Sequence, residues 1–265
     1  EMTLPRCVVD IYDIDKNDSD YSVKLEDFKK WEHKYDKIHE NSFVDLKTDL
    51  FIFDMDGVLV DTERIFMENM VILSKKEGYN IAQEDLLNII GQSNKNADKY
   101  MKSIYGENFD FIKLAFEIDK LFILKAKQSL IPLKLGVIEI LDFLKKENKK
   151  IALASSSNFE KIKAILENTD IYNYFDYIIS GESLKESKPN PEIFSKVLDY
   201  FNVKADKSVV FEDSLNGLKA SKSLGSFTVF IPDIVGINNE NSKYYDKVCN
   251  SLSEVLESLK NRKEV

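Results

Sequence analysis

Residues 51–63 read FIFDMDGVLVDTE, an apolar strand that ends in two aspartates, Asp54 and Asp56, with Gly57 directly after them. Two carboxylates about 4 Å apart repel each other by about 4 kcal/mol at an effective dielectric of about 20. A buried strand should not end in such a pair unless a cation compensates the charge. An Asp-x-Asp-Gly run also occurs in tight turns. Its place after a β-branched and aromatic strand, with only oxygen ligands on offer, favours a Mg²⁺ site instead.

From this stretch outward, short apolar runs alternate with helical patterns, which is typical of a parallel sheet covered by helices on both faces. We expect strands at 49–54, 150–155, 176–180, 208–212 and 226–231. Helices are expected near 137–147, 159–168, 191–201, 215–223 and 251–261. For the helix near 191–201, the sequence predicts Asn190 as the cap and Pro191 as the first helical residue. The predicted fold class is therefore α/β, with a doubly wound, Rossmann-like parallel sheet.

A long interruption between the first two expected strands divides this pattern. Residues 63–134 carry helical patterns and no convincing strand, and a connection of that length needs its own core. We expect an α-helical cap domain at 63–134, inserted into a core domain formed by 49–62 and 135–265. Residues 1–48 form an amino-terminal extension of unknown role. Its apolar stripe favours an element docked on the body over an arm that binds a partner.

The composition disfavours several classes of function. A formal charge of −9 argues against nucleic-acid binding, and no apolar run approaches the roughly 18 residues of a membrane span. The first residues lack the pattern of a secretory signal, so a cytoplasmic location is expected. Cys7 and Cys249 have no partners at metal or disulfide spacing. Since His33 and His39 are the only histidines, hydrolysis in the main body has to use carboxylates, hydroxyls and lysines.

Three later stretches place polar residues beside predicted strands or helices: IALASSSN at 151–158, ESKPNPEIF at 186–194 and SVVFEDSLNG at 208–217. The serines can bind phosphate together with the amino terminus of the following helix, or Ser157 or Asn158 can simply cap that helix. A lysine such as Lys188 is ordinarily a solvated charge, although two prolines stiffen its surroundings. The Glu212 and Asp213 pair either precedes a capped helix or supplies further metal ligands.

Taken together, these four stretches resemble the haloacid dehalogenase (HAD) superfamily, in the branch with a helical cap after the first motif. The family pattern D-x-D-G-x-hydrophobic-x-D-[ST] is matched by residues 54–62. The resemblance implies that Asp54 attacks phosphorus to form an aspartyl phosphate. It also implies that Asp56 protonates the leaving oxygen and later activates water.

The same resemblance implies roles for the other motif residues. Phosphate would be bound by the Ser155 hydroxyl, the backbone N–H of Ser156 and the Lys188 ammonium. Mg²⁺ would be held by Asp54, the backbone carbonyl of Asp56, Asp213 and, directly or through water, Glu212. Ser214 and Asn216 would help to orient these carboxylates.

The nearest resemblance within the superfamily is to β-phosphoglucomutase and related sugar-phosphate phosphatases. In the mutase, a histidine follows the D-[ST] pair and an arginine follows a Gly-x-Ser in the cap, whereas Phe66 and Asn94 stand here. Asparagine lacks the charge and the forked donors that arginine offers to a remote phosphate. We therefore expect a phosphatase acting on a small phosphorylated metabolite, preferably a sugar phosphate, rather than a sugar phosphomutase. Asn94, Lys95 and Lys99 are the candidate substrate contacts from the cap.

Two functions without catalysis are disfavoured. A receiver-like phosphorylation switch would carry its aspartate on a later strand and would have no large insertion, and a degenerate scaffold protein would lack a motif residue. The order and completeness of the four motifs argue against both. The only partner expected is the phosphorylated metabolite, without nucleic acid or membrane, and neither its identity nor an oligomeric state is evident from the sequence.

Overall fold

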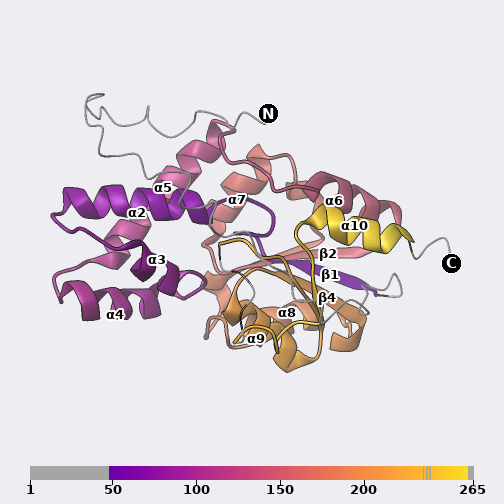
Figure 1. The fold of residues 1–265 in the computed structure, drawn as a ribbon. Coiled ribbons are helices and arrows are strands. Elements are labelled where there is room, and N and C mark those ends of the chain that lie inside the picture. Colours follow the sequence, from indigo (N-terminus) through magenta and orange to yellow (C-terminus); the bar gives the residue numbers. More distant parts are fainter. Residues whose placement is uncertain (1–47, 235, 237, 239, 262–265) are drawn as a thin grey trace. The chain divides into compact units, whose positions relative to one another are not determined.

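The computed structural model describes residues 48–234, 236, 238 and 240–261. The predicted amino-terminal extension lies outside these residues, apart from Thr48. A six-stranded parallel sheet has the order β3-β2-β1-β4-β5-β6 (Figure 1). Its strands are β1 Leu50–Phe53, β2 Lys150–Ser155, β3 Tyr177–Ser180, β4 Ser208–Glu212, β5 Phe227–Phe230 and β6 Lys247–Val248. The expected α/β fold with a doubly wound parallel sheet is confirmed.

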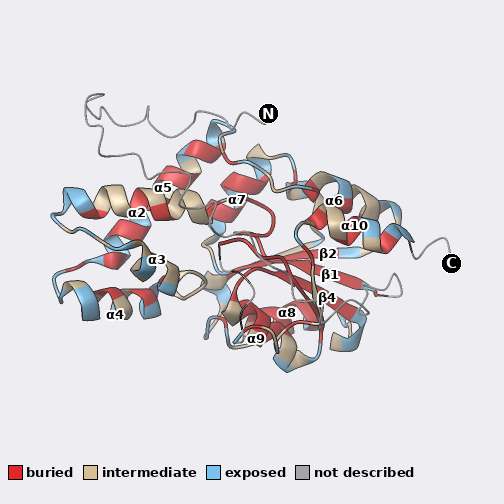
Figure 2. Ribbon diagram, viewed as in Figure 1, coloured by how far each residue is buried: buried red, intermediate tan, exposed pale blue. Residues whose placement is uncertain are grey.

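Helices cover both faces of this sheet, and the alternation of side chains along β1 explains why. Phe51 and Phe53 belong to one buried cluster with α6, α7 and α10, whereas Leu50 and Ile52 belong to another with α8 and α9. Figure 2 shows the strands as a buried layer between these two groups of helices. Their bounds are α6 Val137–Lys146, α7 Phe159–Asn168, α8 Glu192–Phe201, α9 Leu215–Leu224 and α10 Leu252–Asn261.

Local sequence signals predicted most of these bounds. The strands at 150–155 and 208–212 lie where the apolar runs place them, and α8 begins at Glu192, one residue after the expected Pro191. The Asn190 side chain still accepts a hydrogen bond from the Glu192 N–H, at 2.9 Å. The edge strand β6 was not predicted, because two residues are too few to show an alternating pattern.

The segment between β1 and β2 is helical, as its sequence predicts. It contains α2 Glu63–Lys76, α3 Gln83–Ile89, α4 Asn94–Tyr105 and α5 Phe111–Lys127. The side chains of Ser93 and Asp110 cap α4 and α5. Buried residues of these helices join the cluster that also covers one face of the sheet. The division into a cap domain and a core domain stays a prediction. None of the described helices combines the length and apolar character needed to cross a bilayer.

The strand order brings the polar motifs to one edge of the sheet. The chain passes from β1 to β2 on one side and returns to β4 on the other, so a crevice opens at the carboxyl ends of β1 and β4. Phe53 lies beside Phe211 in the register of these strands, and the Asp54 N–H donates to the Phe211 carbonyl at 3.0 Å. This register sets Asp54 next to Glu212.

Candidate active site

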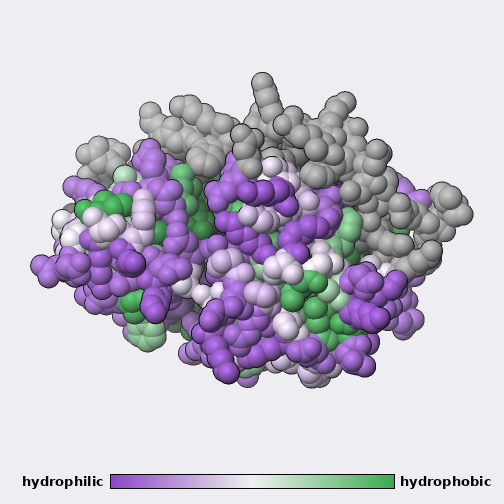
Figure 3. Space-filling view, turned by 90° about the horizontal axis from the view of Figure 1, so that it is seen from below, coloured by the Kyte–Doolittle hydropathy of each residue, from purple (hydrophilic) through white to green (hydrophobic). Residues whose placement is uncertain are grey.

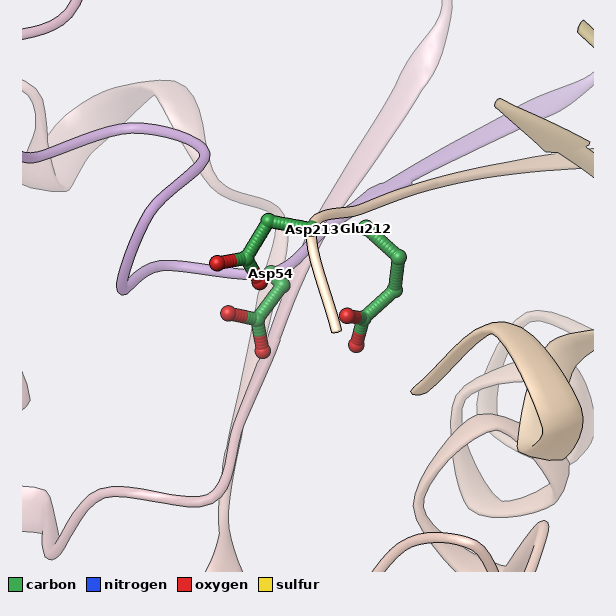
Figure 4. Close-up of side chains that lie close together, drawn as sticks. All are labelled: Asp54, Glu212 and Asp213. Carbon is green, nitrogen blue, oxygen red and sulfur yellow. The ribbon is translucent and has the colours of Figure 1, made fainter. Parts of the chain in front are cut away.

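Three carboxylates meet where β1 and β4 end. One oxygen each of Asp54, Glu212 and Asp213 lies within 4.8 Å of the others, and all three residues are buried. Figure 4 shows the side chains of this acidic cluster, with Asp54 from the end of β1 and the other two from the end of β4. The arrangement follows from the parallel register, since neighbouring strands deliver their last residues to the same place.

One lysine is buried with the acidic cluster. Lys188 comes from the loop between β3 and α8, and its Nζ lies 2.6 Å from Asp54 Oδ1 and forms a second ion pair with Glu212. It also donates to the Ala154 carbonyl at 3.2 Å. Burial would lower the pKa of Lys188, but Asp54 and Glu212 outweigh this effect and raise it. Lys188 therefore stays charged between two carboxylates.

The single lysine leaves the acidic cluster short of positive charge. Burial raises the pKa of Asp54 to about 8 against the opposing charge of Lys188, and repulsion from Glu212 and Asp56 adds to the rise. Burial and repulsion from Glu212 and Asp54 likewise raise the pKa of Asp213, which forms no ion pair within the described chain. A buried set of oxygen donors with surplus negative charge fits a hard divalent cation such as Mg²⁺.

Two glycines allow the acidic cluster to form. A Cβ on Gly57 would lie 2.0 Å from Asp213 Oδ2, and a Cβ on Gly217 would lie 1.9 Å from the Glu212 Cδ. Gly57 also has a φ of +75°, which L side chains rarely adopt. The carboxylates thus occupy space that any other residue at these two positions would fill.

Asp56 faces a different set of partners. Its carboxylate accepts hydrogen bonds from Thr62 Oγ1 at 2.6 Å and Ser157 Oγ at 2.8 Å, and the Lys161 Nζ lies 3.1 Å away. Burial alone would raise the pKa of Asp56, but Lys161 and these hydroxyl donors lower it below its usual value. The surroundings therefore raise the pKa of Asp54 and lower the pKa of Asp56, although the two residues are only two positions apart.

Lys161, on α7, was not identified from the sequence. It is buried, and besides Asp56 it lies 3.8 Å from Asp119 Oδ1 of α5 and 4.4 Å from the centre of the Phe122 ring. Asn158 also holds Asp119, at 2.8 Å, and accepts the Lys161 N–H as the cap of α7. No sequence signal distinguishes this lysine from the solvated lysines around it, because its partners come from distant parts of the chain.

The predicted phosphate-binding serines take different places. Ser155 is fully buried, and its hydroxyl accepts the Ser157 N–H at 3.1 Å and contacts Asp56 at 3.5 Å. Ser156 and Ser157 line a cleft next to the acidic cluster, together with Lys188. The roles of Ser155, Ser156 and Lys188 toward phosphate stay predictions. Ser157, one of two candidates for helix cap, instead bonds Asp56, and Asn158 is the cap.

The candidate contacts from α4 divide into two groups. Asn94 lines the cleft, whereas Lys95 and Lys99 are exposed and are not among the described residues that line it. The cleft has a volume of about 990 Å³ and lies between the carboxyl edge of the sheet and α2, α4 and α5. A contact of Asn94, Lys95 or Lys99 with substrate stays a prediction.

Two polar residues that follow the Glu212–Asp213 pair, Ser214 and Asn216, differ from each other in role. Ser214 donates from its N–H and its hydroxyl to Glu212, at 3.2 and 3.0 Å, as expected of a group that orients this carboxylate. Asn216 does not contact the carboxylates, because its amide donates to the Gly91 carbonyl at 2.8 Å. Asn216 thus connects α9 to the loop between α3 and α4.

Comparisons with known proteins agree with this geometry. A family model described as haloacid dehalogenase-like hydrolase matches residues 51–231. A phosphorylated carbohydrates phosphatase of Thermotoga maritima is 34% identical over 177 residues, which cover 66% of this chain and 80% of that protein. Hexitol phosphatase B of Escherichia coli is 26% identical over 77% of this chain and 92% of its own length. A crystal structure of β-phosphoglucomutase from Clostridium difficile is 25% identical, covers 82% of this chain and all of its own, and has a TM-score of 0.66.

Proposed function

Because the chain belongs to the haloacid dehalogenase-like hydrolases and has relatives named as phosphatases, we propose that it is a Mg²⁺-dependent phosphatase of a small phosphorylated metabolite. The favoured substrate is a sugar phosphate, and the reaction passes through an aspartyl phosphate on Asp54. The observation that carries the proposal is the buried acidic cluster with Lys188 at its side. Relatives named for phosphorylated carbohydrates and hexitols support the substrate class. A cytoplasmic location stays a prediction.

The proposed reaction has two steps. An oxygen of Asp54 forms a bond to phosphorus while the bond from phosphorus to the leaving oxygen breaks, and Asp56 gives its proton to that oxygen. Asp56 then takes a proton from water, whose oxygen attacks the aspartyl phosphate and releases inorganic phosphate and the Asp54 carboxylate. Lys188 offsets the charge of the phosphoryl oxygens beside Asp54.

The acidic cluster and the backbone carbonyl of Asp56 are the groups that would hold Mg²⁺. When bound, the ion would neutralise charge on the carboxylates and on the phosphoryl oxygens. Without a cation the pKa of Asp54 is about 8 and that of Asp56 is low, the reverse of what a nucleophile and an acid need. Added positive charge beside Asp54 lowers its pKa, and a dianionic phosphate beside Asp56 favours the protonated acid.

The alternative, a sugar phosphomutase, needs a second anchor for a remote phosphate. Within the described chain the only arginine, Arg64, is already paired with Asp61 and Asp233 at 2.7 and 3.0 Å. Asn94 and Phe66 line the cleft without offering a charge. These observations favour water over a second sugar hydroxyl as the acceptor of the phosphoryl group.

The test is phosphate release from a panel of phosphorylated metabolites, with Mg²⁺ or with a chelator. We expect hydrolysis that requires Mg²⁺ and falls by a factor of about 10³ or more in Asp54→Asn. A coupled assay for isomerisation of β-glucose 1-phosphate runs beside it. Isomerisation faster than hydrolysis would support the mutase, and an Asn variant that retained activity would refute Asp54 as the nucleophile.

A further inference from the structure

One wall of the cleft is apolar and comes mainly from α5. Ile112, Phe116 and Leu124 line the cleft, yet they are 45%, 58% and 49% exposed. Their spacing places them within one third of the helix circumference. Among the large apolar residues that the described chain leaves exposed, these three are the ones that line the cleft. A cluster of this kind inside a concave site is a mark of ligand binding.

The apolar wall is continuous with the candidate catalytic residues. Phe66 of α2 and Phe111 of α5 line the same cleft, with ring centres 6.4 Å apart. Phe66 lies one helical turn from Thr62 and donates its N–H to the Thr62 carbonyl at 2.9 Å, and the Thr62 hydroxyl bonds Asp56 at 2.6 Å. A group attached to the leaving oxygen beside Asp56 would therefore extend along this wall.

The charges in this part of the cleft oppose a second anion. Besides Lys188, two lysines line the cleft, and each already has partners. Lys161 forms ion pairs with Asp56 and Asp119. Lys120 forms an ion pair with Glu117 at 3.1 Å, and its Nζ lies 4.3 Å from the centre of the Phe116 ring. Five carboxyl residues line the cleft outside the acidic cluster: Asp56, Glu63, Asp119, Glu160 and Glu182. Burial raises the pKa of Glu63 to about 8, so this group is largely protonated at neutral pH, and the other four still outnumber the two lysines. A substrate with a second phosphate or a carboxylate would meet surplus negative charge there.

The other exposed large apolar residues of the described chain lie on separate segments: Ile104, Leu135, Phe159 and Tyr200. Figure 3 shows one face of the molecule as mostly hydrophilic, with apolar side chains gathered in a few separate patches. Ile104 of α4 is as exposed as Ile112, but it does not line the cleft. It offers a matched position outside the site.

We infer that the leaving group of the substrate is uncharged and carries an apolar or aromatic ring, which packs on Ile112 and Phe116 of α5. The substrate class is thus a sugar monophosphate with a ring substituent, rather than a bare sugar phosphate or a bisphosphate. This inference rests on the proposed function and narrows its substrate. The ring gains apolar contact with α5, and the absence of a second anion avoids the carboxylates.

The first experiment compares three esters of one sugar in kcat/KM. Ribose 5-phosphate is the reference, nucleoside 5′-monophosphates add a ring, and ribose 1,5-bisphosphate adds a second phosphate. We expect the ring to raise kcat/KM about tenfold, the gain of roughly one well-packed apolar contact, and the second phosphate to lower it. Equal values for the reference and the nucleoside esters, or the highest value for the bisphosphate, would overturn the inference.

The second experiment tests the wall itself. Phe116→Ala and Ile112→Ala should each raise KM for the nucleoside esters by about three- to tenfold, leaving kcat for these esters nearly unchanged. The preference for the nucleoside esters over ribose 5-phosphate in kcat/KM should fall accordingly. Ile104→Ala should leave KM and kcat unchanged for both substrates. Equal losses on both substrates contradict the inference. So does an altered oligomeric state in Phe116→Ala without a change in selectivity, since the wall would then bind a second copy of the chain.

A third measurement separates this inference from the proposed function. The leaving group of acetyl phosphate is acetate, which is too small to extend along α5 and needs no protonation. Its Mg²⁺-dependent and Asp54-dependent hydrolysis therefore reports on phosphoryl transfer to Asp54 without a contribution from the apolar wall. If acetyl phosphate is hydrolysed but the ring gives no advantage, only the inference fails. If neither acetyl phosphate nor any ester is hydrolysed, the proposed function fails and the inference falls with it.

Discussion

Two buried lysines decide the electrostatics of the site at the scale of single residues. Lys188 neutralises part of the acidic cluster, and Lys161 neutralises Asp56. Each lysine lies beside one of the two aspartates in residues 54–56. The two lysines come from different elements, Lys188 from the loop before α8 and Lys161 from the first turn of α7. Because a buried ion pair stabilises a protein only while both partners remain, each lysine is a sensitive position.

Replacing Lys188 should destabilise the protein strongly. Lys188→Met leaves Asp54 and Glu212 buried without their cation, so we expect the free energy of unfolding to fall by about 3–5 kcal/mol in the absence of Mg²⁺. Urea denaturation with a chelator measures this change, and added Mg²⁺ should recover part of it. Lys185→Met, an exposed lysine in the same loop, is the control. An unchanged unfolding midpoint in Lys188→Met would show that the two ion pairs of Lys188 contribute little to stability.

Replacing Lys161 should affect catalysis through Asp56. Lys161→Met should raise the pKa of Asp56, which favours its acid form, but it also removes the contact that holds this carboxyl group in place. We expect the loss of position to dominate, so that kcat for an alkyl phosphate falls about tenfold or more. An aryl ester such as p-nitrophenyl phosphate should lose less, because its leaving group needs little protonation. Lys163→Met, at an exposed position of the same helix, is the matched control. Equal losses on the two esters would mean that Lys161 acts only on the fold.

At the scale of elements, the loop between α3 and α4 fits closely against the start of α9. The Asn216 amide donates to the Gly91 carbonyl, and a Cβ on Gly91 would lie 2.6 Å from the Ser214 Cβ. Ser214 in turn donates to Glu212. The helical segment between β1 and β2 is therefore in contact with a residue that positions the acidic cluster.

This contact predicts different effects for two glycine substitutions. Gly91→Ala and Gly106→Ala both place a side chain at positive φ, +70° and +94°, which costs about 1–3 kcal/mol of stability. Only Gly91→Ala also displaces Ser214, since nothing lies within 4 Å of a Cβ on Gly106. We expect a loss of stability from strain in both variants, and a fall in kcat/KM in Gly91→Ala alone. Equal kcat/KM in the two variants would contradict the coupling.

At the scale of the whole molecule, folding brings together carboxylates that repel one another. The chain has a formal charge of −9, and three of its buried acidic groups converge where β1 and β4 end. The raised pKa of Asp54, about 8 against an ordinary 3.8, means that the folded protein without metal holds a proton there at neutral pH. This contribution to stability is complete below the ordinary pKa and is lost as the pH rises toward 8.

The stabilisation by Mg²⁺ should therefore depend on pH. Below pH 8 the ion must displace the Asp54 proton, and the pKa of Asp213 is raised by burial as well, so the affinity for Mg²⁺ should fall at least tenfold for each unit of pH lost. We expect the rise in Tm on adding Mg²⁺ to be larger at pH 8 than at pH 6, while the Tm without metal changes in the opposite direction. Thermal unfolding across this range checks the prediction, with Asp54→Asn as the variant that has no carboxyl proton to release at this position. A Tm increment that does not vary with pH would contradict it.

Much of the fold and part of the candidate site could be predicted from the sequence, because those features depend on local patterns. The apolar runs at 150–155 and 208–212 predicted their strands, and the residues Asp54, Lys188, Glu212 and Asp213 stood out because each follows or precedes a recognisable element. Parallel strands that end at one edge must bring such residues together. The sequence by itself therefore determined the fold class, the family resemblance and the residues of the acidic cluster.

Only the tertiary structure decided which side chains meet across distant segments. Lys161 resembles any helical lysine until α5 and the Asp56 turn pack around it, and Asn216 contacts Gly91 rather than the carboxylates. The exposure of Ile112 and Phe116 toward the cleft likewise depends on how α5 sits over the sheet edge. Periodicity and capping report on neighbours along the chain, whereas these contacts arise from the packing of whole elements, which no local pattern records.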